Sequence, residues 1–314
     1  MLQFPISVFF DERKCYEFLM ELLHPEGLRC PCGHPLPLDQ APHKRQRRPC
    51  VVDYQCCFCG SVFNIFTNTV WSGSSYKCSV ILRILQGFSE GITTLHLSQE
   101  LGVDYGSLLE RRHQLYGNAF DNRHEEALED ETAEADELFQ NAGEKGTPHP
   151  DPEDPPRRRA NKRKGKGTME NDRPPIAGVV GRDSGKIRLD VSENTQQKTI
   201  QPQIKNKTQD SVTLYTDESS AYNNVASTGR SHSTVCHSKK EYARDDDGDG
   251  ICEVHCNTME GIWTGLRNFL RPFRGVHKKY LHLYVNIFES AHNIKRLTND
   301  FLRAMLMPST LKPI

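Results

Sequence analysis

The sequence of 314 residues contains no long hydrophobic run. No window approaches the ~18 consecutive apolar residues that span a bilayer. The first residues, MLQFPISVFFDERK, lack the basic, apolar and small-residue segments of a signal peptide. We therefore expect a cytoplasmic protein that does not enter a membrane and whose thiols stay reduced. The formal net charge is only −1, so overall charge points to no class of partner.

Charge is nevertheless concentrated in two segments. Residues 121–137 carry nine acidic residues against one arginine, whereas residues 157–173 carry eight Lys and Arg against two acids. The basic segment lies within residues 141–175, which are rich in Pro and Gly and have too few apolar residues to order themselves. We predict a disordered basic loop at 141–175, inserted in the second half of the chain and able to grip phosphate.

Because disulfides are not expected, the eleven cysteines need another explanation. Seven lie within the first 60 residues, and five of these belong to the motifs CPCG (30–33) and CCFCG (56–60). Two such knuckles bring thiolates to one tetrahedral ion, with Gly permitting each turn. We predict a helix and zinc ribbon over residues 1–75. The expected ligands are Cys30, Cys32, Cys56 and Cys59. The first knuckle has one residue between its two cysteines instead of the usual two, so His34 could replace one ligand.

Residues 76–120 have the pattern of a helix-turn-helix. A helix beginning near Thr93 is followed by Gly102-Val103, and Asp104 is placed to cap a second helix. Arg111, Arg112 and His113 are expected on or near the recognition helix. An ordinary helical hairpin fits the same pattern, but the neighbouring zinc ribbon favours DNA binding.

Residues 121–314 read as a third domain of alternating strands and helices. Strands are expected at 132–138, 176–182, 186–192, 211–216 and 231–236, and helices at 195–204, from 257 and at 280–293. Three strands precede the first helix, which is the order of a ribonuclease H-like fold. The predicted class is therefore α/β, a mixed five-stranded sheet with helices, preceded by the zinc ribbon and the helix-turn-helix.

Polar residues fall at three places in this expected fold. Asp136 lies on the first strand and Asp217 ends the fourth, so neighbouring strands would bring the two carboxylates together. The helix after the fifth strand carries Asn257, Glu260 and Arg267 on one stripe, with Trp263 on another. Crowded carboxylates repel unless a divalent cation intervenes, and oxygen ligands select Mg²⁺ or Mn²⁺. Two such ions can promote in-line phosphoryl transfer.

Two further polar features have weaker interpretations. His255, at the start of the last helix, could contact DNA or metal, and His237 is another polar candidate. The run from Asp245 to Gly250 imitates a calcium loop, but its twelfth position is Cys256 instead of Glu. We interpret that run as a solvated acidic loop.

The combination of motifs resembles the zinc-ribbon DDE transposases of prokaryotic insertion sequences, the ISXO2-like group. The resemblance covers nearly the whole chain. It rests on the two cysteine knuckles, the helix-turn-helix, ADELF (135–139), LYTDESSAY (214–222), CHSKKEY (236–242), HCNTMEGIWTGLR (255–267), FRGV (273–276) and FESAHN (288–293). The short first knuckle, the long proline-rich loop and Arg267 in place of the usual Lys depart from the family pattern.

The resemblance implies a DNA transposase that binds the ends of an insertion sequence and cleaves and joins DNA strands. It implies catalytic Mg²⁺ or Mn²⁺ on Asp136, Asp217 and either Glu260 or Asn257, and Arg267 near the DNA phosphate. Glu260 is favoured slightly, since it brings charge and stands seven residues before Arg267, the usual interval in DDE enzymes. Double-stranded DNA is the expected partner, bound by a homodimer associated with the nucleoid. The rivals are a DNA-binding regulator without chemistry and a nuclease or resolvase without strand transfer.

Overall fold

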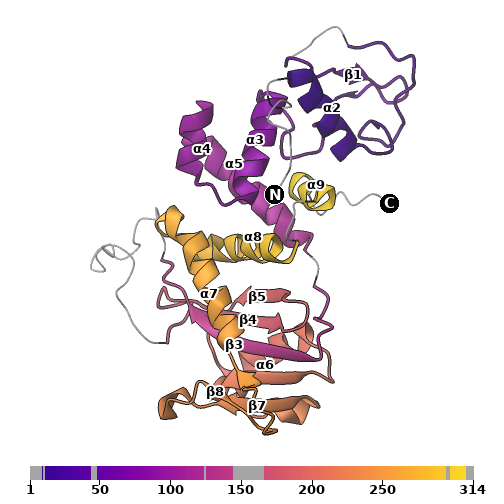
Figure 1. Cartoon of the computed structure of the whole chain (residues 1–314). Helices are drawn as coiled ribbons and strands as arrows, with labels where there is room; N and C mark the ends of the chain where they lie inside the picture. The colour runs from indigo at the N-terminus through magenta and orange to yellow at the C-terminus, as the bar shows by residue number, and fades with distance from the viewer. Residues whose placement is uncertain are drawn as a thin grey trace. The chain divides into compact units, whose positions relative to one another are not determined.

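The computed structural model describes residue 9 and residues 11–43, 48–123, 125–143, 166–294 and 298–308. It divides into two compact units, Met1–Arg123 with Ile294–Ile314, and His124–Asn293 (Figure 1). Most of the loop predicted at 141–175, residues 144–165, lies outside the described residues. None of the helices in the described part of the chain is long and apolar enough to cross a bilayer.

The first unit combines a small two-stranded sheet with five helices of the described chain. Its elements are α2 (Glu12–Leu23), β1 (Tyr54–Gln55), β2 (Val62–Phe63), α3 (Cys78–Ser89), α4 (Thr94–Leu101), α5 (Tyr105–Asp121) and α9 (Asn299–Leu306). Local sequence explains where these helices begin and end. Asp11 accepts hydrogen bonds from the first turn of α2, Thr93 caps α4 and Asp104 caps α5. Gly102 ends α4 at φ 64°, a left-handed conformation that glycine adopts without strain.

The C-terminal helix α9 belongs to the first unit, whereas we expected the C-terminal segment to continue the domain that begins at 121. Its apolar face, including Leu302 and Met305, is buried, and α9 contacts α2 and α5. Asn118 of α5 donates a hydrogen bond to the Met305 carbonyl, and Arg303 donates to the Leu22 carbonyl. The reason for the difference is that this short amphipathic helix finds its apolar partner among the N-terminal helices.

The second unit is built on a mixed five-stranded sheet, as expected. The main elements are β3 (Thr132–Phe139), β4 (Pro175–Gly181), β5 (Ile187–Val191), α6 (Gln197–Lys207), β6 (Thr213–Asp217), β7 (Ser231–Val235), α7 (Asn257–Leu270) and α8 (Leu281–Ile294). The short ones are η1 (Ser220–Tyr222), η2 (Val225–Thr228), η3 (His237–Lys239), β8 (Ala243–Arg244), β9 (Val254–His255), η4 (Arg271–Phe273) and η5 (Lys278–Tyr280). The sheet order is β5-β4-β3-β6-β7. β3, β6 and β7 are parallel, while β4 is antiparallel to both β3 and β5.

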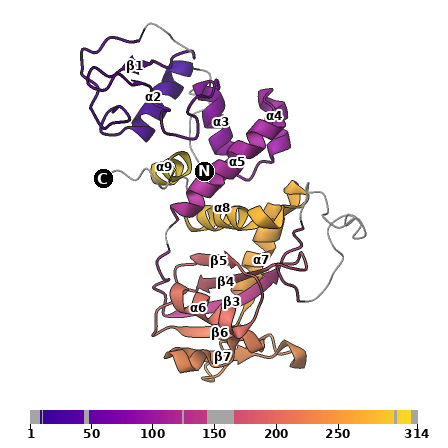
Figure 2. The same ribbon diagram turned by 180° about the vertical axis from the view of Figure 1, so that it is seen from behind.

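Helices α6 and α7 cover opposite faces of this sheet (Figures 1 and 2). Alternation along β3 sends successive side chains to the two faces. Ala133 and Ala135 pack in the same apolar cluster as Ile200 and Ile204 of α6. Glu134 and Asp136 therefore face α7, where the site described below is built.

Polar side chains of α8 form hydrogen bonds with backbone groups along the edge strand β5. Leu189 N donates to Glu289 Oε2 across 2.7 Å. Asn293 accepts from Ile187 N and donates to the Ile187 carbonyl, and His292 Nε2 lies 2.9 Å from the Gly185 carbonyl oxygen. An uncovered edge strand is a template for unwanted pairing. The polar part of the FESAHN motif therefore has a structural role in this unit.

Candidate functional site

The carboxyl ends of β3, β6 and β7 lie at one edge of the sheet, because the three strands are parallel neighbours. Asp217 is the last residue of β6. Its Oδ1 accepts a hydrogen bond from Ser219 N across 2.9 Å, which holds the turn that follows the strand. Asp136 lies within β3, on the neighbouring strand. The two aspartates predicted from sequence are thus carried by adjacent strands.

Asp136 is partly buried and tied to α7. Its Oδ2 accepts a hydrogen bond from Trp263 Nε1 across 2.8 Å. The pKa of Asp136 is raised to about 6, chiefly by burial and also by the charges of Asp217 and Glu260, while the Trp263 bond opposes the rise. The predicted trio is therefore electrostatically coupled. Its oxygens are not among the described groups of three or more ligand atoms that lie within 4.8 Å of one another.

The amino end of α7 is anchored by Glu134, which is completely buried. One carboxylate oxygen accepts from Thr258 Oγ1 at 2.7 Å, and the other accepts from Met259 N at 3.0 Å. Arg182 Nε donates to the same carboxylate across 2.9 Å. Sequence reasoning missed Glu134. The only signal was an acid two residues before Asp136, and therefore on the same face of β3.

His255 belongs to this anchoring network. Its Nδ1 lies 3.2 Å from Glu134 Oε1 and 3.0 Å from Arg182 Nη2. Burial and the charge of Arg182 lower the pKa of His255, while Glu134 acts in the opposite direction. The contacts observed for this histidine are therefore with the groups that anchor α7.

The polar stripe predicted on α7 is present and exposed. Asn257 is the first residue of the helix, and Asn257, Glu260, Thr264 and Arg267 are all exposed. The opposite stripe, with Ile262, Trp263 and Leu266, is buried. Of the two candidates for a third ligand, only Glu260 contributes charge at Asp136.

Two charged residues beside the predicted ones were not assigned a role from sequence. Burial raises the pKa of Glu137 to about 7, and Asp136 adds to the rise. One oxygen of Glu137 is buried with no hydrogen-bond partner among the described residues. On the cationic side, Arg173 donates to Asn141 Oδ1, and burial together with the charge of Arg267 lowers the pKa of Arg173.

A short turn beside Asp217 holds the CHSKKEY motif at the same edge. Glu218 accepts hydrogen bonds from His237 N at 2.8 Å and Ser238 N at 2.9 Å. These bonds lower the pKa of Glu218 to about 2. Because η3 follows β7, the exposed Lys239 and Lys240 extend from the edge on which Asp217 lies.

In the first unit, the sulfur and nitrogen atoms of a candidate metal site lie together. Cys30, His34, Cys56 and Cys59 each offer a ligand atom within 4.8 Å of all the others. His34 Nδ1 is 3.3 Å from Cys30 Sγ and 3.7 Å from Cys56 Sγ, and Cys59 Sγ is 3.8 Å from Cys30 Sγ. Ligand atoms around a four-coordinate zinc, with bonds of ~2.0–2.3 Å, are separated by ~3.5–3.8 Å. The donor set and its spacing therefore fit zinc.

Cys32, the fourth ligand expected with Cys30, is exposed and is not in this group. His34 takes that place, which is the alternative left open by the short first knuckle. Hydrogen bonds with Ser61 lower the pKa of Cys59 to about 5, and so favour its thiolate. A thiolate is the form that ligates metal.

The predicted helix-turn-helix elements, α4 and α5, are both formed. Arg112, however, is fully buried in α5. It donates to Tyr116 Oη and to the Ile92 carbonyl, and its guanidinium lies 3.9 Å from the Phe88 ring centre. Exposed residues of α5 such as Tyr105 and Ser107 lie instead near its amino end.

The acidic loop that follows β8 forms a second cluster of oxygen atoms. Asp245, Asp247 and Glu253 each have an oxygen within 4.8 Å of the others. Asp245 also accepts hydrogen bonds from Gly248 N and Gly250 N. Exposed acidic groups of this kind are common without an ion, and the solvated acidic loop stays a prediction.

Comparison with known proteins gives a domain match and a relative. Residues 143–290 match the ISXO2-like transposase domain. Over 297 residues the chain is 27% identical to a protein described as an uncharacterized protein in transposable element ISH50 of Halobacterium salinarum, a match that covers 93% of this chain and 94% of that protein. The domain match includes Asp217 and α7, and the longer match extends over nearly the whole chain. Over residues 143–290 the chain is therefore similar to ISXO2-like transposases, and over nearly its whole length it is similar to a protein of a transposable element.

Proposed function

We propose that the protein is a DDE-type DNA transposase that binds the ends of an insertion sequence and carries out strand cleavage and strand transfer. The second unit is then a ribonuclease H-like catalytic domain. Its strand order, with antiparallel β5-β4-β3 followed by parallel β6 and β7, supports this assignment. The observation that carries the proposal is the electrostatic coupling of Asp136 to Asp217 and Glu260 in a chain that matches a transposase domain over residues 143–290.

The chemistry of the donors fits magnesium or manganese. Repulsion among these carboxylates contributes to the raised pKa of Asp136, and a divalent cation would relieve it. Asp136, Asp217 and Glu260 would hold the ions, with Asn257 as the alternative third ligand. When bound, such ions activate the attacking oxygen and stabilise the leaving oxygen of phosphoryl transfer.

The remaining residues of the site position these groups. Trp263 restrains one oxygen of Asp136, and Glu134 holds the first turn of α7, which bears Asn257 and Glu260. Arg267 would contact the DNA phosphate. Arg173 lies close enough for the charge of Arg267 to lower its pKa.

The first unit would supply recognition of the element ends. Zinc on Cys30, His34, Cys56 and Cys59 would stabilise the ribbon, with Cys32 as the alternative fourth ligand. The exposed amino end of α5 would enter the major groove of double-stranded DNA. Because transposition joins two element ends, we propose a homodimer on DNA, associated with the nucleoid.

The Asp217→Ala variant tests the catalytic assignment. It should bind a duplex carrying the terminal repeat of the element as tightly as the unchanged protein, but lose cleavage in Mg²⁺. The matched control is Asp183→Ala, which removes an exposed aspartate from the β4–β5 turn at the opposite edge of the sheet. Cleavage by Asp217→Ala at the rate of the control would contradict the proposal.

Product analysis separates the rival functions. Cleaved DNA without joined species would indicate a nuclease or resolvase. Binding without cleavage by the unchanged protein would indicate a regulator. The third ligand is tested in the same assay, since Glu260→Gln should abolish cleavage and Asn257→Ala should only slow it.

A further inference from the structure

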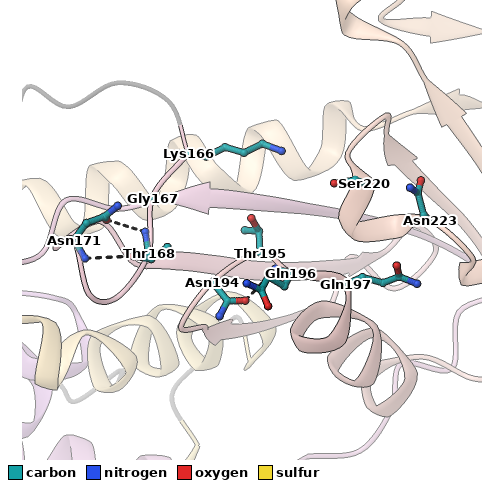
Figure 3. A pocket seen from close by; sticks show the side chains of 10 residues that line it. All are labelled: Lys166, Gly167, Thr168, Asn171, Asn194, Thr195, Gln196, Gln197, Ser220 and Asn223. Atoms are coloured by element: carbon teal, nitrogen blue, oxygen red, sulfur yellow. Dashed lines mark hydrogen bonds between the residues drawn. The ribbon is translucent and has the colours of Figure 1, made fainter.

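A polar pocket of about 590 Å³ lies in the second unit. Its walls come from the segment that precedes β4, from the amino end of α6 and from the turn after β6 (Figure 3). Lys166 extends from the first wall toward the side where Ser220 and Asn223 lie (Figure 3). The volume is within the ~300–1,000 Å³ typical of ligand pockets.

The pocket lies at the same edge of the sheet as Asp217. β4 is antiparallel to β3 and therefore starts at this edge. β5 is antiparallel to β4 and ends there, as does β6, the parallel neighbour of β3. Ser220 lines the pocket and is three residues beyond Asp217. The pocket is thus continuous along the chain with the turn that carries a proposed catalytic residue.

The lining has the chemistry of a phosphate-contacting surface. Lys166 is its only charged residue, and the others are Gly, Ser and Thr hydroxyls and Asn and Gln amides. One wall is the first turn of α6, whose N-cap residue Gln196 makes no side-chain bond to the helix. Lys, hydroxyl, amide and helix-end N–H groups make most contacts to DNA phosphate and sugar. Base-stacking sites use aromatic side chains, and the pocket lining contains none.

We propose that this pocket binds the sugar–phosphate backbone of the DNA strand next to the phosphate that is cut. Lys166 supplies the charge, while Asn223 and the amino end of α6 orient the backbone oxygens. The inference rests on the proposed function, because it takes the cut phosphate to lie at Asp136 and Asp217. It assigns the pocket a positioning role that is independent of base sequence.

The test measures binding in an Asp217→Ala background, so that no cleavage occurs. The probe is a fluorescein-labelled duplex carrying one terminal repeat and its flanking DNA. Lys166→Ala should weaken binding about threefold to tenfold and reduce the slope of log affinity against log salt by about one. Lys186→Ala is the matched control, since it removes an exposed lysine from the β4–β5 turn at the opposite edge. It should leave both quantities unchanged.

Single methylphosphonate substitutions locate the contact. At one phosphate beside the cut position, neutralisation should weaken binding with Lys166 present and cause no further loss in Lys166→Ala. Additive losses at every position, or equal behaviour of Lys166→Ala and Lys186→Ala, would overturn the proposal. Dependence on a base at that position, tested with abasic duplexes, would overturn the assignment to backbone.

The result is separable from that of the catalytic proposal. If the unchanged protein cleaves DNA but the losses of binding caused by Lys166→Ala and by phosphate neutralisation are additive, the pocket assignment alone is rejected. Coupling at Lys166 in a protein that never cleaves DNA in Mg²⁺ would reject the catalytic proposal and retain backbone binding.

Discussion

Trp263 donates its indole N–H to Asp136 Oδ2 across 2.8 Å and so joins helix α7 to the central strand β3. The bond restrains the Asp136 side chain and partly offsets the rise in its pKa that burial causes. The same tryptophan packs beside Gly178, the β4 residue paired with Asp136. The Trp263 side chain therefore connects the apolar stripe of α7 to Asp136.

Trp263→Phe should keep most of this packing and lose the hydrogen bond. We expect the free energy of unfolding to fall by about 2 kcal/mol, as for other hydrogen bonds to charged groups. The pKa of Asp136 should rise above its present value, because the Trp263 bond lowers it. The acid limb of the pH profile for cleavage at fixed Mg²⁺ should then move to higher pH.

The chain contains its own control for this substitution, since it has only two tryptophans. Trp71 is fully buried, and its Nε1 has no hydrogen-bond partner in the described part of the structure. Trp71→Phe should therefore change stability through packing alone and leave the pH profile unmoved. Identical pH profiles for Trp263→Phe and Trp71→Phe would count against the bond as a determinant of Asp136 ionisation.

Gly178→Ala should lift α7 from the sheet. A Cβ atom at this position would lie 2.6 Å from Met259 Cε and from Trp263 Cη2, and 2.8 Å from Leu189 Cδ2. Overpacking of this kind costs about 1–3 kcal/mol, and denaturant unfolding should show the loss. Gly261→Ala, on α7 itself, meets no atom within 4 Å and should stabilise the protein by about 0.5–1 kcal/mol. Equal stabilities of the two variants would refute the close approach at Gly178.

Substitutions in the ribbon should distinguish its candidate ligands by zinc content. His34→Ala and Cys56→Ser should lose the single zinc ion expected per chain, because each removes a member of the four-residue cluster. Cys32→Ser should retain the ion, and so should the control Cys57→Ser. Zinc retained in His34→Ala but lost from Cys32→Ser, measured by metal analysis of purified protein, would reverse the assignment.

Glu289 should make stability depend on pH. Burial raises the pKa of Glu289 from 4.5 to about 7 in the folded chain. Between these values the folded chain binds more protons than the unfolded chain, so the free energy of unfolding falls as pH rises through this window. The loss from pH 5 to pH 8 should be roughly 1–3 kcal/mol.

Glu289→Gln should remove that loss while keeping an acceptor for Leu189 N. The free energy of unfolding of Glu289→Gln, taken as a difference from that of the unchanged protein, should therefore be larger at pH 8 than at pH 5. Glu193→Gln, at an exposed position, controls for removal of a carboxyl group. A difference between Glu289→Gln and the unchanged protein that is constant with pH would show that Glu289 is not protonated in the fold.

Much of the fold could be predicted because the patterns involved are local. Asp104 caps α5 through a bond to Ser107 N three residues away. Spacings of three and four residues placed Glu260 and Arg267 on an exposed stripe of α7, and Trp263 and Leu266 on a buried one. The five strands and their sequence order also followed from short-range patterns. Cofactor and partner assignments depended on the family resemblance, which agrees with the domain match over residues 143–290.

The sequence by itself determined which residue types were available at the two candidate metal sites and on which elements they lie. Only the tertiary structure decided their contacts, because those depend on atoms brought together from distant positions. It gathered His34, and not Cys32, with Cys30, Cys56 and Cys59. It buried Arg112 in α5, and it placed Glu134 beneath Thr258 and Met259, more than 120 residues away along the chain. Periodicity assigns a side chain to a face, whereas long-range packing determines its partner.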